Sequence, residues 1–157
     1  MAIDEYFSQK KQTDILTLQE PLAQPLRYGE NPHQQAAIYG DMSLYFKQLH
    51  GKALSYNNLN DALAAGNLIS DFSQPTVAIL KHCNPCGVAS HANLGEAYRQ
   101  AFAADTRSPF GGIVAVNQPA DEALALEIKK FLPKLLLRRP TQKKHWLFCK
   151  RKRICEF

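Results

Sequence analysis

The 157-residue chain is predicted to fold as an α/β layered domain. The prediction rests on two short apolar runs with strand character, at 76–80 and 112–116, and on helical patterns that alternate with them. Helix–strand–helix–strand–helix is the element order of such a domain. The length and the 45% share of hydrophobic residues suit one domain with a real core rather than two.

The first third of the chain gives weaker patterns. Residues 2–19 are expected to form a helix followed by a short connection. The stretch 21–35 is rich in Pro, Gly, Asn and Gln and is expected to be irregular. Residues 43–49 have aromatic strand character. At 57–61, Asn and Asp side chains can cap free amide groups, which predicts a helix entry and a helix that continues to residue 72.

The remaining elements are more regular. The strand at 76–80 runs directly into a Lys-His turn. The segment 94–104 is predicted to be a helix, because its apolar residues recur on one face. A third helix is expected at 121–131, behind Pro119, since proline favours an early helical position. The strands at 76–80 and 112–116 could be parallel neighbours joined by right-handed crossovers.

Charge is distributed unevenly along the chain. Residues 1–130 carry ten Lys/Arg and thirteen Asp/Glu, whereas residues 131–157 carry nine Lys/Arg and one Glu. Two compositional regimes therefore meet near Phe131, and the basic pI of about 9.1 comes from the second. The first residues lack a basic stretch followed by an apolar core, so no signal peptide is expected, and no apolar run approaches the roughly 20 residues that a membrane span needs. Four cysteines without a secretory signal favour a cytoplasmic protein.

Lys81 and His82 follow the buried strand and place a cation beside a proton-transfer group at the mouth of the sheet. Open α/β sheets bind ligands at the carboxyl ends of their strands. An active-site edge is therefore expected here. The alternative is a solvated lysine beside a packed histidine.

Two cysteines follow at once, in the pattern Cys83-x-x-Cys86. They could form a redox pair, or half of a zinc site together with His82. A structural zinc site would need two further ligands, and His91 is the only candidate nearby. Packing of two small side chains in a turn is the favoured interpretation.

Two more segments carry polar chemistry. The segment 27–34, Arg-Tyr-Gly-Glu-Asn-Pro-His-Gln, has no apolar period, and its Arg27 is a natural phosphate partner. It indicates anion or nucleotide recognition, with a solvated loop as the alternative. The segment 108–112, Ser-Pro-Phe-Gly-Gly, would let a ligand approach the backbone, although a plain turn is the favoured interpretation of this segment taken alone.

Taken together and in this order, four segments resemble the formyltransferase part of the bifunctional purine-biosynthesis family AICAR transformylase/IMP cyclohydrolase. They are 27–34, 54–58 with Asp61, 81–87 (Lys-His-x-Asn-Pro-x-Gly) and 108–112 (Ser-x-Phe-Gly-Gly). The resemblance runs from about residue 2 to about residue 130.

The resemblance implies a cytidine-deaminase-like α/β/α fold, truncated here and without a catalytic zinc. It implies formyl transfer from the co-substrate 10-formyltetrahydrofolate to the amino group of AICAR, giving FAICAR, in a homodimer. His82 would be the proton-transfer residue and Lys81 its catalytic neighbour. The expected substrate-binding residues are Arg27, Tyr28, Asn58 and Gly111.

The same resemblance divides the chain into three parts. Residues 1–20 would be a remnant of the preceding cyclohydrolase domain and its linker, and 21–130 the first part of the transformylase domain. Residues 131–157 would be a tail foreign to the family. Codons compatible with residues 132–150, read in a shifted frame, give TEVIIAPTYSKEALAILQ, which resembles the family's continuation. A frameshift near codon 131 is therefore expected, with a nucleic-acid-binding basic arm as the rival interpretation.

The isolated chain is expected to be inactive, because it lacks the second half of the transformylase region and that region's catalytic asparagine. Two alternatives remain open at this point. One is a nucleotide-binding module without turnover, and the other is a zinc-dependent deaminase-like enzyme that uses Cys83 and Cys86.

Overall fold

A computed structural model describes residues 18–49, 53–131, 135–138 and 146–150. The strands that precede the first long helix are β1 (Leu22–Pro25), β2 (Ala37–Tyr39) and β3 (Phe46–Gln48), with a short 3₁₀ helix η1 (Met42–Leu44) before β3. The rest are α2 (Tyr56–Ser70), β4 (Thr76–Lys81), β5 (Asn84–Ser90), α3 (Leu94–Ala104), β6 (Ile113–Val116), α4 (Glu122–Phe131), β7 (Leu135–Arg138) and β8 (Trp146–Lys150).

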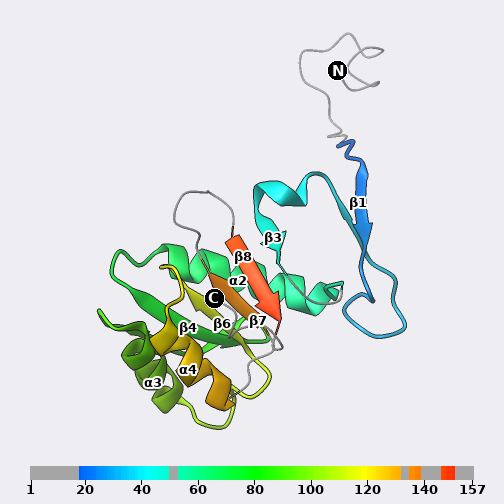
Figure 1. Ribbon diagram of the computed structural model, residues 1–157. Helices are drawn as coiled ribbons and strands as arrows, with labels where there is room; N and C mark the ends of the chain where they lie inside the picture. Colours follow the sequence, from blue (N-terminus) through cyan, green and yellow to red (C-terminus); the bar gives the residue numbers. More distant parts are fainter. Residues whose placement is uncertain (1–17, 50–52, 132–134, 139–145, 151–157) are drawn as a thin grey trace, which may run out of the picture.

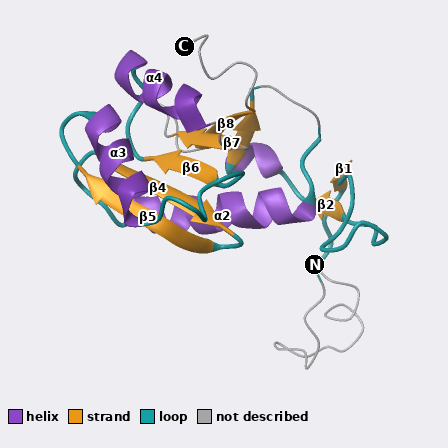
Figure 2. Cartoon of the chain, turned by 90° about the horizontal axis from the view of Figure 1, so that it is seen from below, coloured by secondary structure: helices purple, strands orange, loops and turns teal. Residues whose placement is uncertain are grey.

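The described residues form an α/β/α arrangement, which confirms the predicted fold class. Six strands make one sheet in the order β3-β8-β7-β6-β4-β5. Helix α2 covers one face of this sheet, and α3 and α4 cover the other (Figure 2). The β1–β2 hairpin lies apart from the sheet, at one end of the molecule (Figure 1).

The centre of the sheet is apolar on both faces because β4 and β6 alternate between two cores. Every residue of β6 and every residue of β4 except Lys81 is buried. Ala78 and Leu80 face the core under α2, whereas Val77 and Ile79 face the core under α3 and α4. The apolar runs at 76–80 and 112–116 are thus strands, as predicted.

The expected parallel pairing of these two strands is wrong. β4 and β6 are antiparallel neighbours, with Ala78 opposite Ala115. The reason is β5, which the sequence analysis did not anticipate. The chain reverses after Lys81 and returns antiparallel to β4. Helix α3 then crosses back, so that β6 runs in the direction of β5 and against β4.

Three further expectations need correction. The stretch 21–35 is not wholly irregular, since it contains β1, which pairs with β2. Within 43–49, only Phe46–Gln48 is a strand, preceded by η1. Helix α2 begins before the predicted 57–61 entry, because Ser55 is its N-cap. The helix expected at 2–19 falls mainly on residues 1–17, outside the described residues, and residues 18 and 19 are not helical.

The helices at 94–104 and 121–131 are confirmed to within one residue. Asn93 caps α3 by accepting a hydrogen bond from the Glu96 amide at 3.0 Å. At the start of α4, Asp121 accepts a hydrogen bond from the Leu124 amide at 2.8 Å. This carboxylate, rather than Pro119, meets the exposed amides of the first turn.

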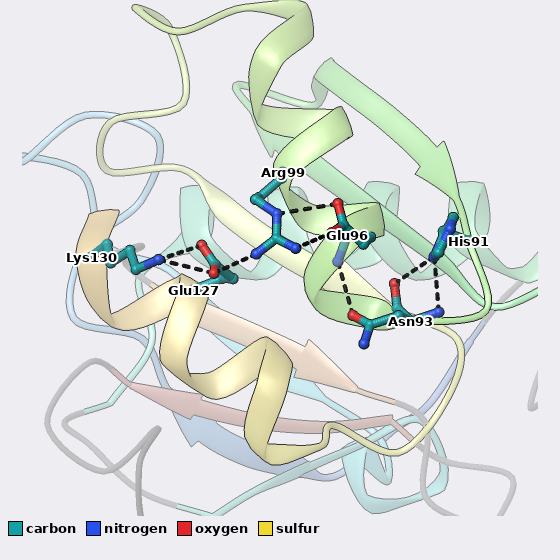
Figure 3. A network of polar contacts seen from close by, with 6 residues as sticks. All are labelled: His91, Asn93, Glu96, Arg99, Glu127 and Lys130. Carbon is teal, nitrogen blue, oxygen red and sulfur yellow. Dashed lines mark hydrogen bonds and ion pairs between the residues drawn. The ribbon is translucent and has the colours of Figure 1, made fainter.

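Charged side chains join α3 to α4 on the outer surface (Figure 3). Arg99 forms an ion pair with Glu96 on its own helix and another, at 2.6 Å, with Glu127 of α4. Lys130 reaches the same Glu127 carboxylate at 2.9 Å. The hydrogen bond from Lys130 lowers the pKa of Glu127, and the Arg99 guanidinium adds to this effect. We call these four residues the α3–α4 ion cluster.

In the part of the chain that the structure describes, no helix combines the length and hydropathy that a membrane span requires.

Candidate functional site

The predicted Lys-His turn is a two-residue hairpin loop between β4 and β5. Lys81 pairs with Asn84, which leaves His82 and Cys83 as the loop residues. Their φ angles are +53° and +61°, so both lie in the left-handed region. Positive φ at both positions defines a type I′ turn, which usually contains Asn or Gly. Ordinary residues held in this conformation store strain, and such strain clusters at functional sites.

Polar contacts hold this turn from two sides. On α2, the Asp61 carboxylate accepts hydrogen bonds from the Cys83 backbone amide at 2.8 Å and from the Cys83 thiol at 3.6 Å. Within the hairpin, the Asn84 side-chain amide donates to the His82 carbonyl at 2.8 Å. The turn is therefore fixed both to itself and to the neighbouring helix.

The first turn of α2 is built to place polar side chains beside this hairpin. Ser55 caps the helix: its hydroxyl accepts a hydrogen bond from the Asn58 amide at 3.3 Å and donates to the Asn58 side chain at 3.1 Å. Ser55 and Asn58 are both buried. Asn57, Asn60 and Asp61 follow the i, i+3, i+4 spacing, so they share one face of the helix.

The segment that begins at Arg27 lies along the start of α2. The Arg27 amide donates to the Leu54 carbonyl, and the Tyr56 amide donates to the Tyr28 carbonyl, both at 3.3 Å. The Asn57 side chain donates to the Glu30 carbonyl at 2.9 Å. The Arg27 guanidinium donates to the Tyr28 hydroxyl at 2.9 Å and lies 4.7 Å from the centre of its ring. Arg27 and Tyr28 thus form one unit.

The loop 105–112 closes the site from the β6 side. The Asp105 carboxylate accepts the amides of Arg107 at 2.9 Å and Ser108 at 3.0 Å, and hydrogen bonding from Ser108 lowers the pKa of Asp105. A side chain on Gly112 would lie 2.6 Å from the Leu80 carbonyl oxygen, so glycine lets this loop approach β4. Gly111 has φ +74° and open space where a side chain would begin.

His82 lies between two cavities. One, of about 280 Å³, is lined by His82 together with Glu30, Asn57, Asn60, Asp61 and Cys83. The other, of about 400 Å³, is lined by His82 together with Lys81, Asn84, Pro85, Cys86, Asp105 and Ser108. All four sequence segments therefore contribute residues to one or the other of two cavities that share His82.

The residues that line the two cavities differ in part from the predicted site residues. Lys81 and His82 line the second cavity, and His82 lines both. Arg27, Tyr28, Asn58 and Gly111 are not among the residues that line either one. Asn58 faces the helix cap instead.

Sequence reasoning missed Glu30, Asn57, Asn60 and Asp105 as lining residues. It named Asp61 only for the helix entry and the family pattern. The helical spacing of positions 57, 60 and 61 was the sequence signal that could have identified the lining residues on α2.

The two cysteines are free and have different surroundings. Cys83 contacts Asp61, whereas Cys86 lines the other cavity. Burial is the main cause that raises the pKa of both thiols, helped by Asp61 at Cys83 and by Asp105 at Cys86. A raised pKa disfavours the thiolate that metal binding and redox exchange need. Among the described residues, no group of three or more His, Cys, Asp or Glu could hold a metal ion.

Comparisons with known proteins show the family to which the chain is similar. Residues 1–154 match the family model described as the AICARFT/IMPCHase bienzyme. The chain is 49% identical over 138 residues to the bifunctional purine biosynthesis protein PurH of Chloroflexus aurantiacus, covering 86% of this chain and 27% of that protein. It is 54% identical over 124 residues to PurH of Roseobacter denitrificans, covering 74% of this chain and 24% of that protein. The chain spans about a quarter of the length of these curated relatives.

Proposed function

Because the chain belongs to the AICARFT/IMPCHase bienzyme family, we propose that it carries the proton-transfer part of an AICAR transformylase. The reaction is formyl transfer from 10-formyltetrahydrofolate to the amino group of AICAR, within the synthesis of IMP. Purine biosynthesis is the role named for its relatives.

The observation that carries this proposal is the position of His82. The imidazole lies at the strained tip of a hairpin, where one cavity ends and another begins. A residue that moves a proton between two bound molecules needs contact with both. The two cavities offer such contact, one beside α2 and one beside Lys81.

The chemistry requires these residue types. An aromatic amine is a weak nucleophile, so His82 accepts its proton while the amine nitrogen bonds to the formyl carbon. Lys81 stabilises the negative charge on the formyl oxygen in the tetrahedral intermediate. The bond from the formyl carbon to the folate nitrogen then breaks, and His82 returns its proton to that nitrogen.

The remaining assignments follow from the family. Arg27 and Tyr28 contact AICAR, Asn58 helps to position the nucleotide, and Gly111 lies against it. The Arg27–Tyr28 unit supports the first assignment, because it pairs a cation with a phenol in the same segment as Glu30, which lines the smaller cavity. For the parent protein we infer a cytoplasmic homodimer without a nucleic-acid partner.

The test replaces the corresponding stretch of the Chloroflexus aurantiacus relative with residues 18–131 of this chain. In that chimera, His82→Ala should lower formyl transfer by about 10²–10⁴-fold, the usual contribution of a general acid–base residue, while AICAR still binds. His91→Ala is the matched control, because the ring of this exposed histidine contacts Asn93 in the turn before α3 and His91 lines neither cavity. Formyl transfer that survives His82→Ala would remove the role given to His82.

For the isolated chain we infer AICAR binding without turnover. The family site needs an asparagine from a part of the relatives that this chain does not match, and it needs a second subunit. Calorimetric titration with AICAR, followed by addition of 10-formyltetrahydrofolate, separates binding from turnover. Formation of FAICAR by the isolated chain would contradict this inference.

We further infer that residues 131–157 arise from a change of reading frame, and that 1–20 and 21–130 are the two family segments. The charge contrast at Phe131 supports the boundary. The match of the family model extends to residue 154, so this boundary rests on the sequence contrast alone. A fresh DNA read across codons 125–155 tests the inference: an in-frame TEVIIAP sequence would establish a sequence error, whereas the present frame would leave a true truncation.

A further inference from the structure

We propose that Asp61 is a positioning residue: it holds the left-handed His82–Cys83 turn and thereby fixes where the His82 imidazole lies. The catalytic meaning of this role rests on the proposed function, whereas the structural claim stands on the geometry of the turn alone. Nothing in the comparisons assigns a role to this carboxylate.

The turn needs an external partner because its own sequence opposes its shape. A type I′ turn favours Asn-Gly, Asp-Gly or Gly-Gly at its two central positions, since left-handed backbone strains other residues. Here the two positions hold His82 and Cys83, with φ of +53° and +61°. Without a compensating contact, the hairpin would relax to another loop conformation and carry the imidazole with it.

Asp61 supplies this contact at the backbone amide of Cys83. Strand pairing joins Lys81 to Asn84, so the Cys83 amide is not part of the ladder. That amide points at the Asp61 carboxylate, 2.8 Å away. A hydrogen bond to an ionised acceptor is stronger than one between neutral groups. The thiol of the same residue adds a second, longer contact at 3.6 Å.

The helix that carries Asp61 is itself firmly placed. Ala62, the next residue, is fully buried, as are Ala65 and Ile69 further along the helix. The Ser55–Asn58 cap fixes the helix start. A carboxylate on such a helix can restrain a loop, because its own backbone does not follow the loop.

The experiment uses the full chain, labelled with ¹⁵N, and three variants. Asp61→Ala removes the acceptor, and Asp61→Asn keeps an acceptor oxygen while removing the charge. Asp71→Asn is the matched control, because it removes a carboxylate at the other end of the same helix. The measurements are the hydrogen-exchange rate of the Cys83 amide and the intraresidue Hα–HN NOE of His82 and Cys83, which is strong only at positive φ.

In Asp61→Ala, the Cys83 amide should exchange at least tenfold faster and both NOEs should weaken. Asp61→Asn should restore exchange to within about threefold of the parent chain, and Asp71→Asn should leave it unchanged. If Asp61 served only to pack the helix, Asp61→Asn would not selectively restore the exchange rate of the Cys83 amide. Unchanged exchange and NOEs in Asp61→Ala would overturn the proposal.

A second variant guards against loss of folding in Asp61→Ala. Glycine adopts positive φ without strain, so Cys83→Gly should make the turn independent of Asp61. In the Cys83→Gly background, Asp61→Ala should therefore weaken the His82 NOE far less than it does alone. An equal loss in both backgrounds would contradict the proposal.

Addition of AICAR to the same samples separates the two proposals. If AICAR fails to bind while the Cys83 amide responds to Asp61 as expected, the proposed function fails and the positioning role stands. If AICAR binds the parent chain and Asp61→Ala equally well while the turn is unaffected, the positioning role fails and the proposed function stands.

Discussion

The two faces of the sheet are built for different tasks. On the face covered by α3 and α4, large side chains such as Tyr98 and Ile128 fill the core, and the α3–α4 ion cluster joins the helices outside it (Figure 3). On the face covered by α2, small residues such as Ala62 and Ala65 dominate the contact, and the polar residues of the helix reach loops. We infer that the α3–α4 face contributes more to stability, whereas the α2 face supplies the helix contact that holds the hairpin turn.

This difference matters because the α2 face can bring a helix close to the sheet while leaving its first turns free for polar contacts. Small residues shorten the distance between helix and sheet. The first two turns of α2 then lie beside the hairpin tip and the Arg27 segment, where Asp61 and Asn57 make their hydrogen bonds. On the opposite side, Asp105 at the end of α3 lines the larger cavity together with His82, and its carboxylate binds the amides of its own loop.

The largest expected effect comes from Tyr98→Ala. The Tyr98 ring is buried and stacks against Phe102, with 6.2 Å between ring centres. Its removal should lower the free energy of unfolding by about 3–5 kcal/mol, as for other buried aromatic residues. Urea denaturation measures this loss, and Tyr98→Phe, which keeps the ring, is the control. A loss below about 1 kcal/mol would show that this face does not carry the stability.

Asn117→Ala is expected to have the second-largest effect on stability. It tests whether stability and site geometry are divided between the two faces of the sheet or between its two ends. Asn117 is buried after β6, where its side chain accepts from the Thr76 amide at 2.9 Å and donates to the carbonyls of Phe72 and Gln74. Unsatisfied buried partners should reduce unfolding free energy by about 2–3 kcal/mol. The Cys83 amide lies at the other end of β4. Its hydrogen-exchange protection should fall only as far as the loss of global stability requires. A selective loss of its protection would contradict the division.

Ser55→Ala should have a smaller effect on stability and a visible effect on the site. Loss of an N-cap hydroxyl lowers unfolding free energy by about 1 kcal/mol. Because the cap fixes the first turn of α2, the Asn57–Glu30 contact should weaken as well. Ser55→Asn, which keeps a capping oxygen, is the control, and ¹⁵N chemical shifts of residues 28–31 report the contact. Unchanged shifts in Ser55→Ala would argue that the Arg27 segment is held independently of the cap.

The smallest expected effect is the contribution of the α3–α4 ion cluster to the pH dependence of stability. The pKa of Glu127 is lowered in the folded chain, first by Lys130 and then by Arg99. A lowered folded pKa contributes stability above the unfolded value, near 4.5, and that contribution is lost as pH falls through the folded pKa. Unfolding free energy should therefore drop slightly less between pH 6 and pH 3 in Glu127→Gln than in the parent chain. The same drop in both would exclude a net contribution from this carboxylate.

The sequence predicted the central elements well because their patterns agree with their environment. The strand 76–80 and the helix 94–104 bury continuous or periodic apolar faces, and both are observed. β5 escaped prediction because Asn84, Pro85 and Gly87 are typical of turns. It forms because β4 lies beside it as a template and because α3 sits directly on Gly87, where a side chain would meet the Ala101 carbonyl at 1.9 Å. Such tertiary contacts leave no local signature.

The candidate site was predictable in location but not in its partners. The end of a buried strand marked Lys81 and His82, and both residues line a cavity in the structure, while their catalytic role stays a prediction. The sequence could not show that His82 adopts a left-handed conformation, since nothing in its own type requires one. Nor could it show that Asp61, twenty-two positions away along the chain, reaches the Cys83 amide. Contacts of this kind depend on how α2 packs, and that was visible only in three dimensions.

The left-handed turn has a consequence for how such a chain can change over generations. Replacing Cys83 by glycine relieves backbone strain, and Asn-Gly at 82 and 83 would relieve more, so substitutions that stabilise the hairpin are easy to reach. The second of these also discards the imidazole. With the role proposed for His82, selection for a stable hairpin and selection for chemistry therefore act in opposite directions at one dipeptide. In related chains that keep the fold without that chemistry, glycine or asparagine is expected at these two positions.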